Sequence, residues 1–311
     1  MFCSDFKIVG YCVHRVLEVD TLDKVSREGI FALRKLTSLR EFLYHPGYSQ
    51  SPVVRLCLEL LPHLHHLQDV DGSISLFDIT KPCTVQLRNL STHDLYDVSD
   101  FVSFPELRSL TLWDRLEMHP LFAGGLPKLS ELYLKDTDQD NLLVVLGHVG
   151  RQLKKLHVSI MCVGVHLKLD RVMGACPNLS ELKVSTDSNQ LDGSQLQLDT
   201  LKHLESVTFE LSEREDFLQP GLLLQFLRKA PQLRSVNVTN FNIHHQDLKE
   251  WAELAEHSTC MQNLQQIQLQ FYATRRSEEA KPLWQKVLSS CSINCPQLQI
   301  ASVKYMCAVL R

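Results

Sequence analysis

Three groups of residues in this sequence have side chains of the types that bind metal ions. The first is His63, His65 and His66, the second is Cys291 with Cys295, and the third is an alternation of aspartates that begins at Asp136. A structural zinc ion needs about four ligands that converge at roughly 2.0–2.3 Å. A calcium loop of the EF-hand type needs a glycine near its centre and a glutamate at its end.

None of these groups meets the requirements of a metal site. Leu64 belongs to an apolar pattern and should point into the core, so the histidines on either side of it diverge. The two cysteines have no second pair at the spacing of a zinc ribbon. Asp136, Asp138 and Asp140 lack the glycine and the glutamate, and they predict a solvated turn that caps a helix at Asn141.

The motifs that catalysis would use are missing as well. The sequence has no G-x-x-x-x-G-K-S/T, no G-x-G-x-x-G, no H-E-x-x-H and no G-x-S-x-G. We therefore predict that the protein is not an enzyme, needs no cofactor, and has no catalytic or metal-binding residue. Its function would then depend on a surface that recognises another molecule.

A recurrent pattern, L-x-x-L-x-L, organises the chain. Six copies begin two residues after a proline, and they open at Leu64, Leu107, Leu129, Leu179, Leu233 and Leu298. Weaker copies open at Leu39, Leu153, Leu204 and Leu264, and a degenerate copy lies at Val85-Leu87. Self-similarity at such intervals predicts a repeat architecture.

Helical patterns fill the intervals between these segments. Apolar residues recur at helical spacing over 28–36, 52–61, 220–229, 245–257 and 278–290, while 15–19 has the pattern of a first strand. We predict an α/β leucine-rich-repeat solenoid, a horseshoe with parallel strands on its concave face and helices and irregular segments on its convex face. It would form a single domain of about 11–12 repeats over residues 1–311.

The composition of the sequence indicates which classes of partner and which cellular compartment to expect. The net charge of −4 and the pI near 6.4 give no basic footprint for nucleic acid. No stretch approaches the roughly 18 apolar residues that span a membrane, and the N-terminus lacks the features of a secretory signal. The cysteines form no disulfide framework, and Cys176 and Cys295 occupy an apolar position before a repeat proline. These features predict a cytoplasmic or nuclear protein without nucleic-acid or membrane partners.

The side chains between the leucines should form lateral rows on the concave face. One row contains Arg88, Trp113 and Lys135, and the next contains Tyr133, His157 and Lys183. We predict that these six residues bind a protein partner, because aromatic side chains on a rigid sheet are typical interface anchors. The alternative for Trp113 is that its ring folds over the end of the strand and covers the core.

Four segments carry a resemblance to a known family. They are FPELRSLTL (104–112), LPKLSELYL (126–134), ACPNLSELKV (175–184) and APQLRSVNV (230–238). They resemble the start of the strand in the ribonuclease-inhibitor-like superfamily, and most of all the irregular repeats of F-box/leucine-rich-repeat proteins. The resemblance implies a recognition scaffold, and a substrate receptor of a cullin-type ubiquitin ligase.

Two departures from that family affect the prediction. The position eight residues after each opening leucine holds no Asn or Cys, so no side-chain ladder is expected there. Nothing resembles an F-box, so a ligase adaptor would need a segment not present here; either there was none, or the chain is a fragment of a longer product. A regulatory or inhibitory repeat protein that acts by occlusion, with no link to a ligase, is the alternative function.

Overall fold

The computed structural model divides the chain into two compact units, Met1–Lys135 and Asp136–Arg311, and each is described by itself. The single domain over 1–311 stays a prediction. The residues that the structure describes are 16–20, 41–45, 69–71, 83–84, 86–92, 102–113, 122, 126–135, 137–160, 167–186, 191–193, 196, 201–211, 216–257, 261–272 and 275–306.

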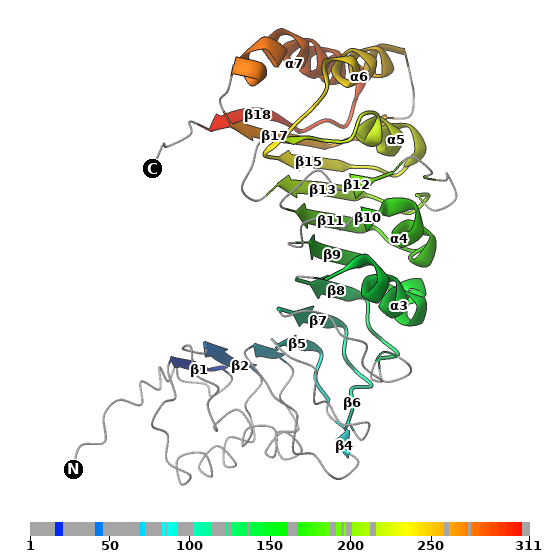
Figure 1. Cartoon of the computed structure of the whole chain (residues 1–311), viewed down its shortest axis with the longest axis vertical. Helices are drawn as coiled ribbons and strands as arrows, with labels where there is room; N and C mark the ends of the chain where they lie inside the picture. Colours follow the sequence, from blue (N-terminus) through cyan, green and yellow to red (C-terminus); the bar gives the residue numbers. More distant parts are fainter. Residues whose placement is uncertain are drawn as a thin grey trace, which may run out of the picture. The chain divides into compact units, whose positions relative to one another are not determined.

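Unit 1 contains a parallel sheet whose strands follow one another in chain order (Figure 1). Its strands are β1 (Val16–Asp20), β2 (Glu41–His45), β3 (Asp69–Asp71), β5 (Asn89–Thr92), β7 (Ser109–Leu112) and β8 (Glu131–Leu134). A second, short parallel pair joins β4 (Cys83–Thr84) to β6 (Val102–Ser103). The expected first strand at 15–19 is therefore confirmed as β1, within one residue at each end.

In unit 2, strands and helices alternate along the chain. Its main parallel sheet contains β9 (Lys155–Ile160), β11 (Glu181–Thr186), β13 (Ser206–Leu211), β15 (Ser235–Thr239), β17 (Gln266–Tyr272) and β18 (Ile300–Met306). Short parallel pairs join β10 (Leu167–Lys168) to β12 (Leu191–Asp192), and β14 (Asp216–Phe217) to β16 (Phe241–Asn242). Its helices are α3 (Gln139–Val149), η3 (Gly150–Gln152), α4 (Leu169–Ala175), α5 (Leu222–Lys229), α6 (His245–His257) and α7 (Arg275–Asn294). In Figure 1, α3, α4 and α5 lie one after another beside the strands, in chain order.

Most of the predicted helices agree with the structure. The pattern over 245–257 gives α6 with the same bounds. Helix α5 starts two residues later than predicted, after Gly221, whose φ of 73° only glycine adopts without strain. Helix α7 is longer than the predicted 278–290 and tolerates Pro282 inside it. The predicted helices at 28–36 and 52–61 lie outside the described residues. The expected cap is also confirmed, since Asp138 Oδ1 accepts the backbone N–H of Asn141 at 2.8 Å.

The same backbone turn precedes the copies of the repeat pattern that open at Leu107, Leu129, Leu153, Leu179, Leu204, Leu233, Leu264 and Leu298. In each of these copies the amide of the opening leucine donates to the carbonyl three residues before it, as at Leu107 to Phe104, Leu179 to Cys176 and Leu233 to Ala230. The residue after that leucine then offers its carbonyl to two amides of the next copy. Arg88 accepts from Arg108 and Ser109 in this way, and Glu205 accepts from Arg234 and Ser235. A repeated sequence pattern thus becomes a repeated set of lateral hydrogen bonds.

The leucines of the pattern form the core. Alternation along the strands buries Leu110 and Leu112 on β7, and Leu182 and Val184 on β11, while the residues between them stay half-exposed. The helices bury their own apolar residues, such as Leu142 on α3 and Trp251 on α6. Cys176 and Cys295 are buried, as their position before the repeat proline predicted. None of the helices among the described residues could span a membrane.

The register of two early repeats differs from the prediction. The repeat pattern that opens at Leu64 would place Val70 in the row of Arg88 and Trp113, but the structure pairs Val70 with Leu90 on β5, and Leu90 is buried. Leu87 and Leu90 are both buried, so L-x-x-L begins at Leu87 and the strand is Asn89–Thr92. The expected strand at Val85-Leu87 is therefore wrong. The physical reason is that a degenerate copy of L-x-x-L can be aligned with the strand in more than one register. Hydrogen bonds to the neighbouring strands then decide which register forms.

Asparagine side chains join several repeats laterally. Asn178 Nδ2 donates to the Arg151 carbonyl at 2.7 Å, and Asn263 Nδ2 donates to the Pro231 carbonyl at 2.8 Å. Asn240, directly after β15, donates to the Leu211 carbonyl at 2.8 Å. The expectation of no side-chain ladder concerned the next position, Phe241, so the bond from Asn240 lies one residue before it and is a single lateral contact.

Candidate functional site

The candidate site is the face of each sheet that the apolar core does not cover. Because side chains alternate along a strand, the residues between the buried leucines share one face. We call this surface the polar face. In unit 1 its described members are Asn89, Ser91, Ser109, Thr111, Trp113, Glu131, Tyr133 and Lys135. In unit 2 they run from Lys155, His157 and Ser159 on β9 to Gln266, Gln268 and Gln270 on β17.

Unit 1 carries an aromatic patch on this face, formed by Ser91, Trp113, Tyr133 and Lys135. The rings of Trp113 and Tyr133 meet edge to face, with 5.3 Å between centroids and 88° between planes. The indole N–H of Trp113 donates to Ser91 Oγ at 2.7 Å, and Lys135 Nζ lies 5.8 Å from the indole centroid. The first geometry is favourable for aromatic pairs and the last for a cation–π contact.

The indole leans back over β7. Thr111 pairs laterally with Ser91 on one side and with Tyr133 on the other. Trp113 contacts both of these neighbours, so its ring must lie towards Thr111. The indole is 37 % exposed, among the few large apolar side chains so exposed in the described residues. Trp113 therefore keeps enough exposed surface to contact a partner, and the alternative, that its ring folds over the end of the strand and covers the core, stays a second interpretation. The backbone beneath is fixed too, because the Lys135 amide donates to the Leu112 carbonyl at 2.9 Å.

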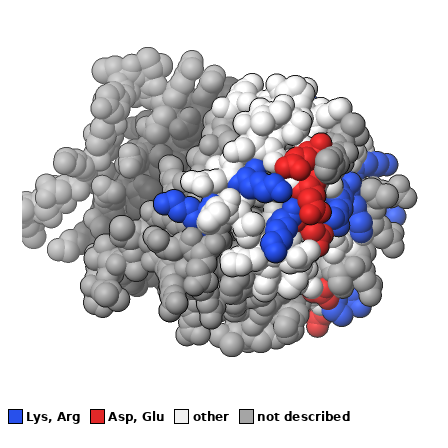
Figure 2. All heavy atoms as spheres, turned by 90° about the horizontal axis from the view of Figure 1, so that it is seen from above, with Lys and Arg blue, Asp and Glu red and all other residues white. Residues whose placement is uncertain are grey.

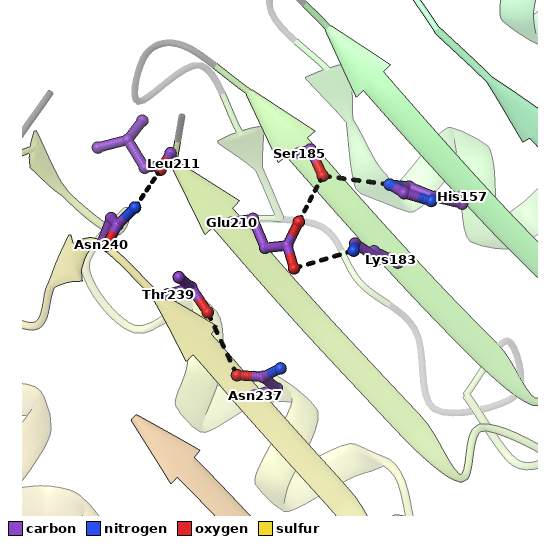
Figure 3. A network of polar contacts seen from close by, with 8 residues as sticks. All are labelled: His157, Lys183, Ser185, Glu210, Leu211, Asn237, Thr239 and Asn240. Atoms are coloured by element: carbon purple, nitrogen blue, oxygen red, sulfur yellow. Dashed lines mark hydrogen bonds and ion pairs between the residues drawn. The ribbon is translucent and has the colours of Figure 1, made fainter. Parts of the chain in front are cut away.

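Unit 2 carries a polar network of four side chains: His157 on β9, Lys183 and Ser185 on β11, and Glu210 on β13 (Figure 3). Lys183 Nζ lies 2.9 Å from Glu210 Oε1. Ser185 Oγ donates to Glu210 Oε2 at 3.0 Å, and His157 Nε2 lies 3.1 Å from Ser185 Oγ. Figure 3 shows Glu210 between the lysine and the serine, so one carboxylate serves two donors.

The direction of these bonds argues against nucleophilic catalysis. Ser185 has one proton and donates it to Glu210, so its oxygen accepts from His157 Nε2–H. A serine nucleophile needs the opposite arrangement, with histidine accepting the serine proton and an acid behind the histidine. The network therefore fixes side chains and does not activate the hydroxyl.

The imidazole of His157 is neutral at physiological pH. Burial lowers the pKa of His157 to about 4, the Lys183 ammonium lowers it as well, and the Glu210 carboxylate partly opposes both. Neutral His157 is the form that the hydrogen bond to Ser185 uses. The polar network therefore consists of one charged pair, Lys183 and Glu210, and two neutral side chains, His157 and Ser185.

The predicted residues separate into three sets. The structure brings Trp113, Tyr133 and Lys135 together in the aromatic patch, and His157 and Lys183 together in the polar network. Arg88 does not share a row with Trp113. It lies one residue before the start of β5 at Asn89, and its carbonyl accepts from the amides of Arg108 and Ser109, which places it beside the start of β7. The expected placement of Arg88 is wrong for the register reason given above.

Sequence reasoning missed three residues of the site as candidates: Ser91, Ser185 and Glu210. Ser91 was missed because the strand of its repeat was placed too early. Ser185 and Glu210 stood in the predicted rows, and their adjacent positions on paired strands would have suggested the bond between them. Nothing in their residue types distinguished them from other polar groups on the face.

Charged side chains over the far end of unit 2 are of both signs. Figure 2, which looks at the molecule from above, shows lysine or arginine beside aspartate or glutamate and no broad field of one sign. Glu256 lies 3.9 Å from Lys286 and accepts from Ser290 at 3.0 Å. Arg228 pairs with Glu250 at 3.1 Å. On the described residues of this face, cations and carboxylates therefore lie side by side.

Buried thiols and side chains of metal-ligand types are the remaining reactive groups of the described residues. A contact with Cys295 and burial raise the pKa of Cys291, and burial raises the pKa of Cys176 to about 12. These thiols are therefore poor nucleophiles. Within the described part of the chain no three His, Cys, Asp or Glu side chains gather as a metal site would require.

Comparison with known proteins adds no assignment. No protein-family model matches the chain, and none of the curated proteins matches it. The likeness to leucine-rich repeats therefore depends on the chain's own residues.

Proposed function

We propose that this protein is a leucine-rich-repeat solenoid whose polar face, on the concave side, binds a protein partner. The recurrent turns and lateral hydrogen bonds before parallel strands support the repeat architecture. We place it in the cytoplasm or nucleus, which free buried thiols at Cys176, Cys291 and Cys295 favour.

The observation that carries the proposal is the aromatic patch. Trp113 stays 37 % exposed although a hydrogen bond and a ring contact hold it in place. An anchor of this kind buries a large area at low cost in side-chain entropy, because its rotamer is already fixed.

The test is affinity purification of the full chain from cell lysate beside a Trp113→Ala/Tyr133→Ala variant. The matched control is Ile293→Ala, which removes a 78 % exposed apolar side chain from α7. A protein recovered with the unmodified chain and the control, and lost with the double variant, supports the proposal. Recovery that does not change with the double variant overturns the role of the patch.

The same purification separates the two biological roles. A substrate receptor of a cullin-type ligase would also recover adaptor subunits, with either form of the patch. A regulatory or inhibitory protein that acts by occlusion would recover its partner without them. Both roles use the same binding surface, so the patch variants bear on each.

A further inference from the structure

We infer that the aromatic patch recognises a protein segment that presents an apolar side chain together with a carboxylate. This inference rests on the proposed function and names the chemistry of the partner. It depends on three features of the patch: how the indole N–H is used, what surrounds the Lys135 ammonium, and how far that ammonium lies from the ring.

The indole offers an apolar surface and not a hydrogen bond. Its single N–H already donates to Ser91 Oγ at 2.7 Å. Its edge-to-face contact with Tyr133 fixes the plane of the ring. What Trp113 presents to a partner is therefore hydrocarbon and π surface, for which an apolar side chain is the complement.

Lys135 adds the second requirement. Among the described residues its ammonium has the indole as its neighbour and no carboxylate within ion-pair distance. A group that covers Trp113 also removes water from Lys135 Nζ, 5.8 Å from the ring centroid. A buried charge that loses water without a new partner is strongly unfavourable, so the covering segment must supply an acceptor. A carboxylate would accept a hydrogen bond from the Lys135 ammonium and offset the lost hydration, whereas a lysine or arginine would be repelled.

Glu131, a second charge among the described residues of this face, does not reverse the preference. Glu131 lies four residues before Lys135, which places it about 13 Å away along the strand direction. That separation exceeds the Debye length of about 8 Å at physiological ionic strength. An acidic group beside Lys135 therefore feels the lysine far more than the glutamate.

The geometry also sets a spacing. The apolar group must contact the ring and the carboxylate must reach Nζ, so the two partner groups lie about 6–7 Å apart, which side chains at i and i+2 of an extended segment span. Side chains at i and i+3 or i+4 of a helix, about 5–6 Å apart, also satisfy it.

The test uses random dodecapeptides displayed on phage, selected on the full chain and counter-selected on Trp113→Ala. We expect the selected peptides to share an apolar residue and an Asp or Glu at one of these spacings. The best peptide is then synthesised in two forms, with the carboxylate and with the corresponding amide. Each is titrated into the unmodified chain and into Lys135→Gln, with Trp113 fluorescence as the readout, since Trp251 and Trp284 are only 1 % and 3 % exposed.

Carboxylate and lysine should behave as a coupled pair. The amide form should bind the unmodified chain about tenfold more weakly, and the two forms should bind Lys135→Gln almost equally. Far-ultraviolet circular dichroism of Lys135→Gln confirms that the variant is folded. Equal binding of both forms to the unmodified chain, with binding still dependent on Trp113, overturns the inference and leaves the proposed function standing. If no selected peptide depends on Trp113, the patch is not a recognition surface and both fail.

Discussion

Trp113 donates its indole N–H to Ser91, a residue 22 positions earlier in the chain and one strand away in the sheet. The bond joins two successive repeats on their exposed side. It also determines which way the largest apolar group of the patch points. A small hydroxyl on β5 thus positions a ring that begins beyond the end of β7.

Ser91→Ala should loosen that ring with little effect on the fold. The bond is exposed to water, so its loss should lower the free energy of unfolding by only about 0.5–1.5 kcal/mol. Acrylamide quenching and fluorescence anisotropy of Trp113 should report a more mobile indole. The matched control is Ser109→Ala, on the same face of the neighbouring strand. Equal quenching in Ser91→Ala and the control would show that the bond does not hold the ring.

The sequence predicted the strands of the later repeats, and the reason is physical. Where the apolar residues recur strictly, as at Leu107, Leu110 and Leu112, only one frame buries them all, and the structure has that frame. Around Val70 and Leu87 the apolar pattern of the sequence fits more than one frame. The choice there depends on hydrogen bonds to neighbouring strands, which a local pattern does not contain.

The site was predictable in its composition but not in its connections. Trp113 and Lys135 directly follow the last leucine of a strict copy, and Tyr133 lies between the last two leucines of one, so their place on the face follows from the pattern. The bond to Ser91 depends on a register that was assigned wrongly, and the His157–Ser185–Glu210 chain depends on rotamers. Side-chain rotamers result from packing between repeats, so the local spacing of residues does not predict them.

Stability should fall in mild acid because of His157. Its folded pKa of about 4 lies below the unfolded value of 6.5, so the unfolded chain binds the proton first as the pH falls. The contribution is therefore complete above pH 6.5 and is lost between pH 6.5 and about 4. Because the ring is partly exposed, we expect a loss of about 1–2 kcal/mol after screening.

Urea unfolding at several pH values between neutral and about 4 measures this effect. The His157→Gln variant should show a shallower dependence on pH than the unmodified chain. His203→Gln serves as the control, because His203 is exposed on the turn that precedes β13. The same slope in His157→Gln and the unmodified chain would assign the acid sensitivity to other groups.

The neighbours of His157 should move its pKa in opposite directions. The Lys183 charge lowers the pKa of His157, so Lys183→Met should raise it. The Glu210 charge raises that pKa, so the isosteric Glu210→Gln should lower it further. An NMR titration of the His157 ring protons measures both shifts. Two shifts of the same sign would mean that the substitutions change burial of the ring and not its electrostatic surroundings.

Two glycines at the end of α3 should respond oppositely to the same substitution. A Cβ at Gly147 would meet nothing within 4 Å, whereas one at Gly150 would lie 2.5 Å from the Ala175 carbonyl oxygen. Gly147→Ala should stabilise the protein by about 0.5–1 kcal/mol, because alanine loses less backbone entropy in a helix. Gly150→Ala should destabilise it, because backbone of the adjacent repeat must shift to make room.

Thermal and urea unfolding of the two variants measure the difference between them, with Gly174→Ala as a further control. A Cβ at Gly174 also meets nothing within 4 Å, and this residue lies in α4. Gly174→Ala should therefore follow Gly147→Ala in direction. Stabilisation by Gly150→Ala would show that the close approach of η3 to the carbonyl of Ala175 is absent in solution. The packing between these two repeats would then differ from the arrangement described here.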